Sequence, residues 1–507
     1  IPFETVNDVY VTTSKLDYIY LADSKNDRII HLYDREAFQD EPTPFYIFDI
    51  YGQNQQKHEM YFCHDSVLCI EHEAWIVINL YPHRADALHD NTKKALLDPE
   101  KTDIRYYTED GYIEFEERRL QGTQLWLLKG KNQPAYALTG MGGKESYFIK
   151  MTVLDIEPFR NFSLDKMTVK SVAGKLEPDL INANGIVQNT REFYPFGEKP
   201  SPFAEVYFVS KDALCKKGAN VSLTFTLDFA KIPVDLQVEE TPVKWKYIMR
   251  RSDFKPDVEY DITIEDVSWE YYNGEGWSRL FISNQYSRVF SCEGNTTGRQ
   301  VTISFRCPDN ISPFLINSIY SYSIRCRILK MNNLYKPKGN YITPVITKPS
   351  FKYDYPNEGM LPMELYTSNN IKEEAYNQKQ LAGSSFTFTP FYGLEDTNLT
   401  MYMGFAIPPV DGPIKILFST VETINEKLPR LSFEYYAAGR WQSLSVVDET
   451  ENMRKTGLIT LIGPHDFTKK DLFGRNLYWI RVTDNENLYY SRIRNRRIPC
   501  INGIHIN

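Results

Sequence analysis

The chain has 507 residues and a mass of 59.2 kDa, enough for about three domains of ordinary size. Its 58 basic and 66 acidic side chains give a formal net charge of -8, which argues against a dedicated nucleic-acid-binding protein, because phosphate contacts need a basic surface. Aromatic residues make up 14% of the chain, with 35 Tyr and 29 Phe, and both types favour the half-buried surface of a sheet. The composition therefore predicts an all-β protein.

Signals for membrane insertion or secretion do not stand out. No uncharged apolar stretch reaches about 18 residues, so we expect no membrane span. The start, IPFETVNDVY, has no basic region followed by an apolar one, so we expect no signal peptide; because it lacks an initiator Met, we expect a processed, trimmed or partial product. The 7 cysteines are scattered, which fits free thiols in a reducing compartment.

Three segments of the chain share a four-part pattern, which indicates an internally repeated fold. The first part is a Tyr-led strand, a polar or Gly/Pro-bearing break and a second apolar strand, and its copies begin at Met60, Val206 and Met401. The second part is a Tyr pair, a tight turn and a further ring. The second Tyr and that ring are five residues apart in every copy: Tyr107 and Tyr112, Tyr272 and Trp277, Tyr436 and Trp441. This spacing predicts an aromatic hairpin with rings on both strands.

The last two parts of the pattern are single strands. An alternating strand follows near Trp126, Ile303 and Thr460, and a Tyr-x-Ile-Lys/Arg strand ends at Lys150, Arg325 and Arg481. With a side-chain period of two, Tyr and Ile share one face and the base points to the other. Order and spacing agree in all copies, whereas the chance self-similarity of a β-rich chain would not preserve both. We therefore predict three repeated antiparallel β-sandwich-like modules joined by long Pro/Asn-rich connectors.

The repeat also sets expected boundaries. They are module one at 1–155, a connector at 156–204, module two at 205–330, a connector at 331–399, module three at 400–490 and a basic tail at 491–507. Prolines at 195, 200 and 202 argue against helix and central strand in the first connector. Connectors of this length are expected to strap along a surface. The best helix candidate is 84–97.

The densest group of metal-ligand residue types is His58, Cys63, His64, Cys69 and His72. Cys69 and His72 have plausible metal spacing, but a structural zinc site needs four convergent ligands. On an alternating strand, Cys63 and His64 point to opposite faces. Buried cysteine acting as a small hydrophobe is the favoured interpretation, so we predict no metal site.

Patterns for catalysis are also missing from the sequence. Gly143-Lys144 lacks the first Gly and the following Ser/Thr of a phosphate loop, and its glycines fit a hairpin turn. There is no Gly-x-Ser-x-Gly elbow, and the acidic pairs at 109–110 and 116–117 fit a solvated surface. We predict that the chain is not an enzyme and has no catalytic residue, no cofactor-binding residue and no cofactor.

Two other classes of function stay open. Tyr and Trp at hairpin tips can stack on sugars, so a carbohydrate-binding β-sandwich adhesin is an alternative, and a secreted β-sandwich enzyme is another. The repeated ring spacing favours rings that fill the sandwich core, because a sugar site would need only one copy. The tail contains arginines at 492, 494, 496 and 497, and in an acidic chain they favour a protein contact over nucleic acid or lipid.

Four segments together point to a family. FYPFGEKPSPFAEVYF (193–208), SWEYYNGEGWSRL (268–280), MYMGFAIPPVDGPIKILF (401–418) and FEYYAAGRWQSL (433–444) resemble the large baseplate assembly proteins of contractile phage-tail-like particles. These are the J-like wedge components of extracellular contractile injection systems. The resemblance covers most of 58–507, and RNRRIPCINGIHIN (494–507) looks like the segment that leads into their J-like core. Module one departs from the pattern, because its turn lacks the Trp and is followed by EFEERR.

The resemblance implies a structural role in a baseplate, around a central hub and below a contractile sheath. The implied partners are other wedge, hub and sheath-proximal subunits, in multiple copies in a ring, with no nucleic acid and no membrane span. The implied location is the bacterial cytoplasm during assembly and then the particle. A J-like core is expected after residue 507, modules two and three are expected to pack against neighbouring wedge subunits, and the connectors are expected to act as straps.

Overall fold

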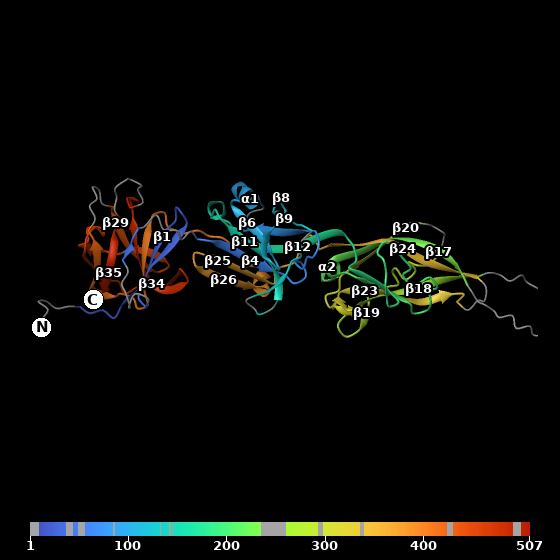
Figure 1. Ribbon diagram of the computed structural model, residues 1–507. Helices are drawn as coiled ribbons and strands as arrows, with labels where there is room; N and C mark the ends of the chain where they lie inside the picture. The colour runs from blue at the N-terminus through green and yellow to red at the C-terminus, as the bar shows by residue number, and fades with distance from the viewer. Residues whose placement is uncertain are drawn as a thin grey trace, which may run out of the picture.

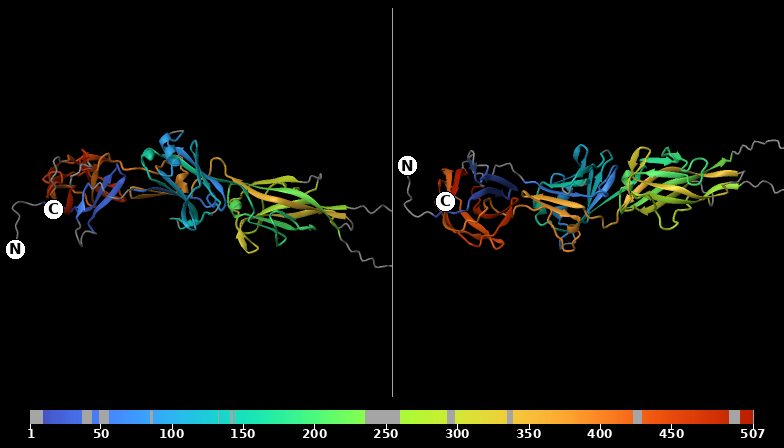
Figure 2. Two further views of the ribbon diagram at one scale, coloured as in Figure 1. Left: turned by 45° about the horizontal axis from the view of Figure 1, so that its top comes forward. Right: turned by 90° about the horizontal axis from the view of Figure 1, so that it is seen from below.

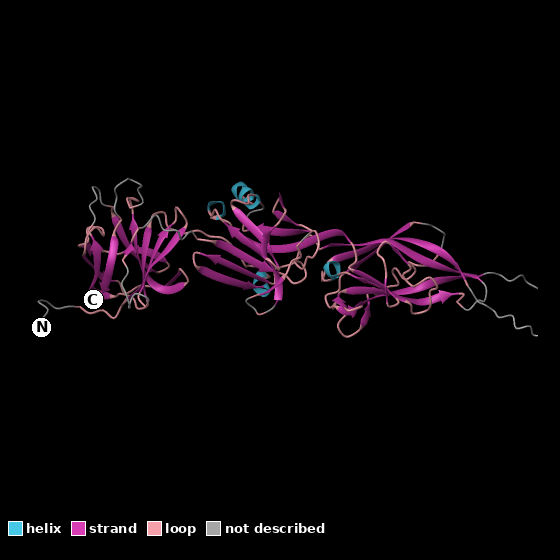
Figure 3. Cartoon of the chain, in the orientation of Figure 1, coloured by secondary structure: helices cyan, strands magenta, loops and turns pink. Residues whose placement is uncertain are grey.

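The computed structural model describes residues 10–36, 44–48, 56–84, 87–131, 133–140, 143, 145–234, 260–292, 298–334, 339–422, 429–489 and 498–506. Strands dominate and most of their pairing is antiparallel, so the all-β prediction is confirmed (Figure 3). The strands form three bodies in a row (Figures 1 and 2). We call them the terminal body, which contains the described residues nearest both chain ends, the middle body and the distal body.

The terminal body is a sandwich of two sheets. In spatial order, one contains β2 (Arg28–Asp34), β1 (Leu16–Asp23), β27 (Thr400–Phe405), β34 (Arg475–Asp484), β29 (Leu431–Ala437) and β30 (Arg440–Ser443), with β33 (Lys470–Leu472) on β34. The other contains β3 (Phe45–Tyr46), β35 (Cys500–Ile506), β28 (Asp411–Val421), β32 (Gly457–Gly463) and β31 (Val446–Asp448). Alternating apolar residues of both sheets, such as Met403 and Phe418, meet in a core between them.

The middle body repeats this arrangement. Its first sheet contains β26 (Lys372–Asn377), β25 (Glu364–Asn369), β4 (His58–Cys63), β11 (Glu145–Val153), β6 (Thr102–Thr108) and β7 (Gly111–Glu114), with β10 (Ala137–Thr139) on β11. Its second layer contains β12 (Leu164–Leu176), β5 (Ala74–Pro82), β9 (Gln124–Lys129) and β8 (Glu117–Gln121). Helix α1 (Asp90–Leu97) confirms the helix predicted within 84–97. Helix α3 (Gln378–Leu381) and a short 3-10 turn (Glu157–Phe159) complete the body.

The distal body has the same two layers. The first contains β14 (Ile186–Val187), β13 (Leu180–Ala183), β16 (Glu205–Val209), β23 (Ser323–Asn332), β18 (Tyr260–Tyr272) and β19 (Trp277–Arg279). The second contains β15 (Glu192–Phe193), β24 (Gly339–Asp354), β17 (Asn220–Pro233) and β20 (Arg299–Arg306). Helix α2 (Lys211–Leu214) and the hairpin of β21 (Phe314–Ile316) and β22 (Ile319–Ser321) are additions. Because β24 also pairs with β12, the middle and distal bodies share a continuous sheet.

The predicted repeat is confirmed strand by strand. The Tyr-led strands β4, β16 and β27 each pair with the Tyr-x-Ile-base strand of their body, and that strand pairs with the aromatic hairpin. The ring pairs expected from the five-residue spacing are direct partners in the ladder: Tyr107 with Tyr112, Tyr272 with Trp277, Tyr436 with Trp441. In the second sheets, β5–β9, β17–β20 and β28–β32 are equivalent pairs. Each body is therefore one copy of the module.

The predicted connectors differ from the structure. The 156–204 segment contains β12 to β15, and the 331–399 segment contains the end of β23, β24 to β26 and α3, so both supply sheet strands rather than straps. Pro344 and Pro349 made the second segment look like a loop, yet Pro349 falls where the β17–β24 register shifts, a place where a strand tolerates proline. The 498–506 part of the tail holds β35, which pairs with β28 and β3. The four tail arginines lie outside the described residues.

A hairpin extends the free edge of every Tyr-led strand. Hairpin β25–β26 lies on β4, β13–β14 on β16, and β1–β2 on β27. Along the chain, each core is preceded by one hairpin, but only β13–β14 lies on the core that follows it. The first and third hairpins are exchanged, so that residues 10–36 and 44–48, which were predicted to begin module one, belong with module three.

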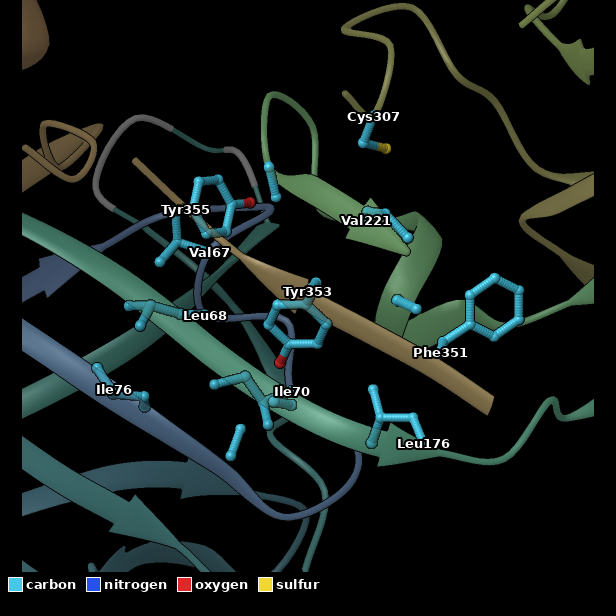
Figure 4. Packing of buried hydrophobic residues seen from close by; sticks show 14 of the residues in the cluster. Val67, Leu68, Ile70, Ile76, Leu176, Val221, Cys307, Phe351, Tyr353 and Tyr355 are labelled. Carbon is cyan, nitrogen blue, oxygen red and sulfur yellow. The ribbon is translucent and has the colours of Figure 1, made fainter. Parts of the chain in front are cut away.

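Apolar packing divides the molecule in two. One hydrophobic cluster runs through the middle and distal bodies, and a second cluster fills the terminal body. Figure 4 shows the first cluster where the bodies meet: Phe351 and Tyr353 of β24 lie beside Leu68, Ile70 and Leu176 of the middle body. Apolar burial of this kind is the main favourable term in folding. The middle and distal bodies are therefore joined by a common core, and the terminal body has a core of its own.

Candidate interaction sites

The outward face of each first sheet carries the same cluster of a tyrosine, a base, a ring and carboxylates. In the distal body, Nε of Arg325 donates to Glu270 at 2.6 Å and its Nη1 to Glu205 at 3.3 Å. The hydroxyl of Tyr207 donates to Glu205 at 2.7 Å. The guanidinium carbon of Arg325 lies 4.2 Å from the centre of the Trp277 ring. Charge-assisted hydrogen bonds and a cation–π contact therefore tie four strands together on one face.

The terminal body has the most buried copy of this cluster. Nε of Arg481 donates to Glu434 at 2.7 Å, its Nη1 donates to Asp396 at 3.2 Å, and its guanidinium carbon lies 4.4 Å from the Trp441 ring centre. The hydroxyl of Tyr402 lies 2.7 and 2.6 Å from the two carboxylate oxygens of Asp396. Burial raises the pKa of Asp396 even though Tyr402 and Arg481 act in the opposite direction.

The middle body has the most exposed copy. Nζ of Lys150 lies 2.8 Å from the Glu59 carboxylate and 5.3 Å from the Tyr61 ring centre, and the Tyr61 hydroxyl donates to Glu59 at 2.7 Å. Burial alone would raise the pKa of Glu59, but the hydrogen bonds from Lys150 and Tyr61 outweigh it and lower the pKa. Tyr112 stands where the other copies have Trp, 6.5 Å from Tyr61 between ring centres.

The rings after the turns do not fill the sandwich cores, so that prediction is wrong. Tyr112, Trp277 and Trp441 are half-buried and lie on the outward face beside the base, whereas Tyr106 and Tyr435 turn into the core. The physical reason is the alternation of side chains along a strand, which places the two members of a Tyr pair on opposite faces. The aromatic excess therefore serves both faces of the first sheets.

A buried charged cluster lies at the joint between the middle and distal bodies. Asp212 in α2 is fully buried, and its Oδ2 accepts the backbone N–H groups of Glu71 at 3.1 Å and His72 at 2.9 Å. Nδ1 of His72 lies 3.3 Å from the same oxygen. The other oxygen faces the Tyr353 hydroxyl at 3.3 Å and the buried amine of Lys216 at 3.4 Å. Burial would raise the pKa of Asp212, but Lys216 and His72 hold it well below its usual range.

A second buried amine fixes the same loop of the middle body. Lys129 at the end of β9 is fully buried, and its Nζ donates to the backbone carbonyls of Glu71 at 3.1 Å, His72 at 3.0 Å and Gly130 at 2.9 Å. Burial lowers the pKa of this amine to about 8. Lys129 and Asp212 therefore pair with the carbonyl and the N–H groups of the same turn, Glu71 and His72.

The joint between the terminal and middle bodies is polar. His58, buried in β4, lies 2.8 Å from Oδ1 of Asn369 through Nδ1 and 2.7 Å from the Asp27 carboxylate through Nε2. Lys372 of the middle body lies 3.4 Å from Asp471 of the terminal body. Beside this ion pair lies a cleft of about 620 Å³, lined from both bodies. This joint therefore relies on directional contacts around a cleft, whereas the joint at the other end combines a charged cluster with a continuous apolar core.

The candidate ligand cluster of the sequence is dispersed in the structure. His58 serves the terminal joint and His72 the distal joint, whereas Cys63 lies on the outer face with Phe148 and Tyr366. Burial raises the pKa of the Cys63 thiol to about 11. Across the described ranges, no group of three or more His, Cys, Asp or Glu side chains is placed to hold a metal ion.

The remaining members of that cluster have local partners. Nδ1 of His64 accepts the backbone N–H groups of Ser66 at 3.2 Å and Val67 at 3.3 Å, and burial lowers its pKa to about 4. The carbonyl of Cys69 accepts the thiol of Cys215 at 3.7 Å. Gly143 lies in the turn before β11 with a φ of 73°, which agrees with the turn expected there.

Sequence reasoning missed the charged cluster at the distal joint. Asp212, Lys216 and Lys129 are isolated charges in the sequence, and no spacing distinguishes them from surface residues. The available signal was the N-cap pattern of Ser210 before α2, where the serine hydroxyl accepts the Ala213 N–H at 3.3 Å. That pattern predicts a helix start but not the partner that its first turn contacts.

Comparisons with known proteins leave the family open. No model of a known protein family matches the chain, and no curated protein matches it. Among solved structures, the crystal structure of dimeric latent PorU from Porphyromonas gingivalis aligns with 8% identity and a TM-score of 0.14, over 89% of this chain and 33% of that chain. A similarity this low carries no argument about fold or function. Within the described ranges, no helix is long and apolar enough to cross a membrane.

Proposed function

We propose that this chain is a structural baseplate component, a wedge subunit of a contractile tail-like injection particle, which joins neighbouring subunits around a central hub. The observation that carries the proposal is the row of three module copies locked to one another. Hairpins exchanged between the first and third modules and the sheet shared by the other two hold this row together. Such a row spans distance and presents repeated faces, as an assembly scaffold requires.

The chemistry of the described residues supports a scaffold more than a catalyst. Polar side chains near the two joints bind neighbouring protein groups: Asp212 and His58 contact the adjacent body, and Lys129 holds a loop of its own body. The buried carboxylates of the outer clusters are matched by an arginine or a lysine. The sequence resemblance to J-like wedge proteins supplies the finer assignment, with other wedge, hub and sheath-proximal subunits as partners.

The alternative of a carbohydrate-binding adhesin has one structural difficulty. Sugars stack on the open face of an aromatic ring, but the guanidinium groups of Arg325 and Arg481 already lie over Trp277 and Trp441. A sugar would have to displace a base that is also paired with buried carboxylates. A glycan array that returns specific binding, lost on Trp277→Ala, would favour the adhesin.

The test is to tag this chain in a bacterium that produces it and to isolate particles by the tag. We expect sheath and hub subunits to copurify, and negative-stain images to show the tag at the baseplate end. A strain that lacks the chain should yield unassembled sheath and tube components. Intact, contractile particles from that strain would overturn the proposal.

A further inference from the structure

In each body, the free edge of the Tyr-led strand (β27, β16 or β4) binds a β-hairpin. We call this edge the slot. The hairpin residues Tyr20, Asn182 and Tyr366 lie directly opposite the lead tyrosines Tyr402, Tyr207 and Tyr61. The residue before each of them is fully buried in the core: Ile19, Ile181 and Leu365. The same register and the same buried position define the slot every time. A register this uniform is set by the side-chain pattern of the two strands.

Chain connectivity does not decide which hairpin fills which slot. The third hairpin, β25–β26, fills the slot of the first core, and the first hairpin, β1–β2, fills the slot of the third core. Two modules that exchange equivalent hairpins in this way are the single-chain counterpart of a domain-swapped pair. The fold therefore already uses exchange to join its own modules.

We propose that β1–β2 is also exchanged between molecules, so that the hairpin of one copy fills the β27 slot of a second copy. The partner is a second copy of this chain, because another copy carries the same hairpin and the same slot. This inference goes beyond the proposed function, since it concerns how copies are linked and holds for the isolated protein too.

The contacts that hold the hairpin on β27 and its surroundings are noncovalent, and a second copy would offer the same ones. The ring of Tyr20 stacks on Phe473 with 4.7 Å between centres, and Nε of Arg475 donates to the Tyr20 hydroxyl at 3.1 Å. Oδ2 of Asp17 accepts the backbone N–H of Ala406 at 2.7 Å. Every one of these partners belongs to the terminal-body core. The exchanged and unexchanged hairpins therefore have the same contacts with that core, and the local concentration of copies decides between them.

The connection between the terminal and middle bodies limits how two copies can be arranged. Phe48, buried in the terminal body, and His58 of β4 are ten positions apart, so that the chain between them spans at most about 35 Å. A copy that donates its hairpin together with Phe48 must therefore place its middle body beside the terminal body of the acceptor. Two copies can exchange hairpins reciprocally, whereas exchange repeated head-to-tail closes into a ring or extends as a chain.

The experiment uses two full-length chains with different tags, produced together. One carries Ala22→Cys and the other Thr400→Cys, because these residues are direct partners in the β1–β27 ladder. Under mild oxidation we expect a covalent heterodimer that a reductant dissolves. The matched control pair is Ala183→Cys with Val206→Cys, direct partners in β13–β16, where the hairpin lies on its own core. We expect at least a several-fold excess of heterodimer over that control.

The proposal is overturned if the two yields are equal while a single chain with both Ala22→Cys and Thr400→Cys closes its own disulfide. If that double variant does not close, the decision rests on the unsubstituted chains. Copurification of the two tags supports exchange when deletion of 1–36 from both chains abolishes it. A monomer mass by light scattering at every concentration overturns it. Particle assembly is read in a different experiment, so failure of this proposal and failure of the proposed function can be told apart.

Discussion

Asp212 of the distal body and His72 of the middle body meet across the joint between those bodies, where the His72 backbone N–H donates to Oδ2 of Asp212 at 2.9 Å. Removing this buried carboxylate leaves the backbone N–H groups of Glu71 and His72 without their acceptor. It also leaves the fully buried amine of Lys216 without a carboxylate partner, although that amine still donates to the Cys69 carbonyl. We expect Asp212→Ala to lower the free energy of unfolding by about 3–5 kcal/mol. Asp212→Asn should cost less, because its oxygen can still accept the N–H groups.

Urea unfolding followed by circular dichroism measures this loss. Asp309→Ala, at an exposed position of the same body, is the control and should change stability by less than about 0.5 kcal/mol. Equal effects of Asp212→Ala and Asp309→Ala would contradict a structural role for the joint.

His64 should make the stability of the protein depend on pH. Burial lowers its pKa to about 4, whereas a histidine in the unfolded chain has a pKa of about 6.5. Between these values the unfolded state binds more protons, so stability should fall by roughly 3 kcal/mol as the pH drops from about 6.5 to about 4. His64→Asn keeps an acceptor for the Ser66 and Val67 N–H groups and removes the titration.

The measurement is the free energy of unfolding at several pH values for the wild type and for His64→Asn. The variant should have a flatter profile between pH 4 and 6.5, as set by the two pKa values above. His465→Asn, at an exposed histidine, should leave the slope unchanged. A wild-type slope retained in His64→Asn would assign the pH dependence to other groups.

The two separate cores predict two unfolding transitions in calorimetry. Phe418→Ala, in the core of the terminal body, should lower the stability of that body by about 3–5 kcal/mol and shift only its unfolding transition. Phe208→Ala in the distal body and Phe159→Ala in the middle body should both shift the other transition, because one core spans those two bodies. A single transition that all three substitutions move equally would show that the terminal joint couples the cores.

The outer clusters predict an order of stability losses. Arg481→Met and Arg325→Met keep the apolar stem but leave the buried carboxylates of Asp396 and Glu270 without their closest cationic partner, so we expect losses of about 1.5–3 kcal/mol. Lys150→Met should cost about 1 kcal/mol or less, because Glu59 is more exposed and can be hydrated. Thermal unfolding of the three variants tests the order, and a larger loss for Lys150→Met would contradict it.

Local sequence patterns predicted much of the fold. The five-residue spacing of Tyr272 and Trp277 predicted a hairpin whose two rings face each other across the ladder, because turn length sets the register. Alternation along 322–325 likewise placed Ile324 in the core and Arg325 outside. Which face the hairpin rings would occupy was misjudged, since the spacing is the same for either face.

These local patterns could not predict which distant segments of the chain pair with each other. Pairing of β1 with β27 joins segments almost 400 residues apart, and nothing in the hairpin sequence specifies the core on which it lies. The strand role of β24 was hidden by Pro344 and Pro349, because a proline in a strand is tolerated only where a bulge or an edge receives it. Whether the chain is a baseplate subunit stays a prediction.

The sequence by itself determined the all-β class, the number of modules and the register inside each hairpin, because strand alternation and turn length act over a few residues. Only the tertiary structure decided which hairpin completes which core, where the modules join and that Asp212, Lys129 and Lys216 are buried at a joint. Backbone groups at a sheet edge accept any strand of suitable pattern. The choice among such strands is therefore made by packing across the whole chain.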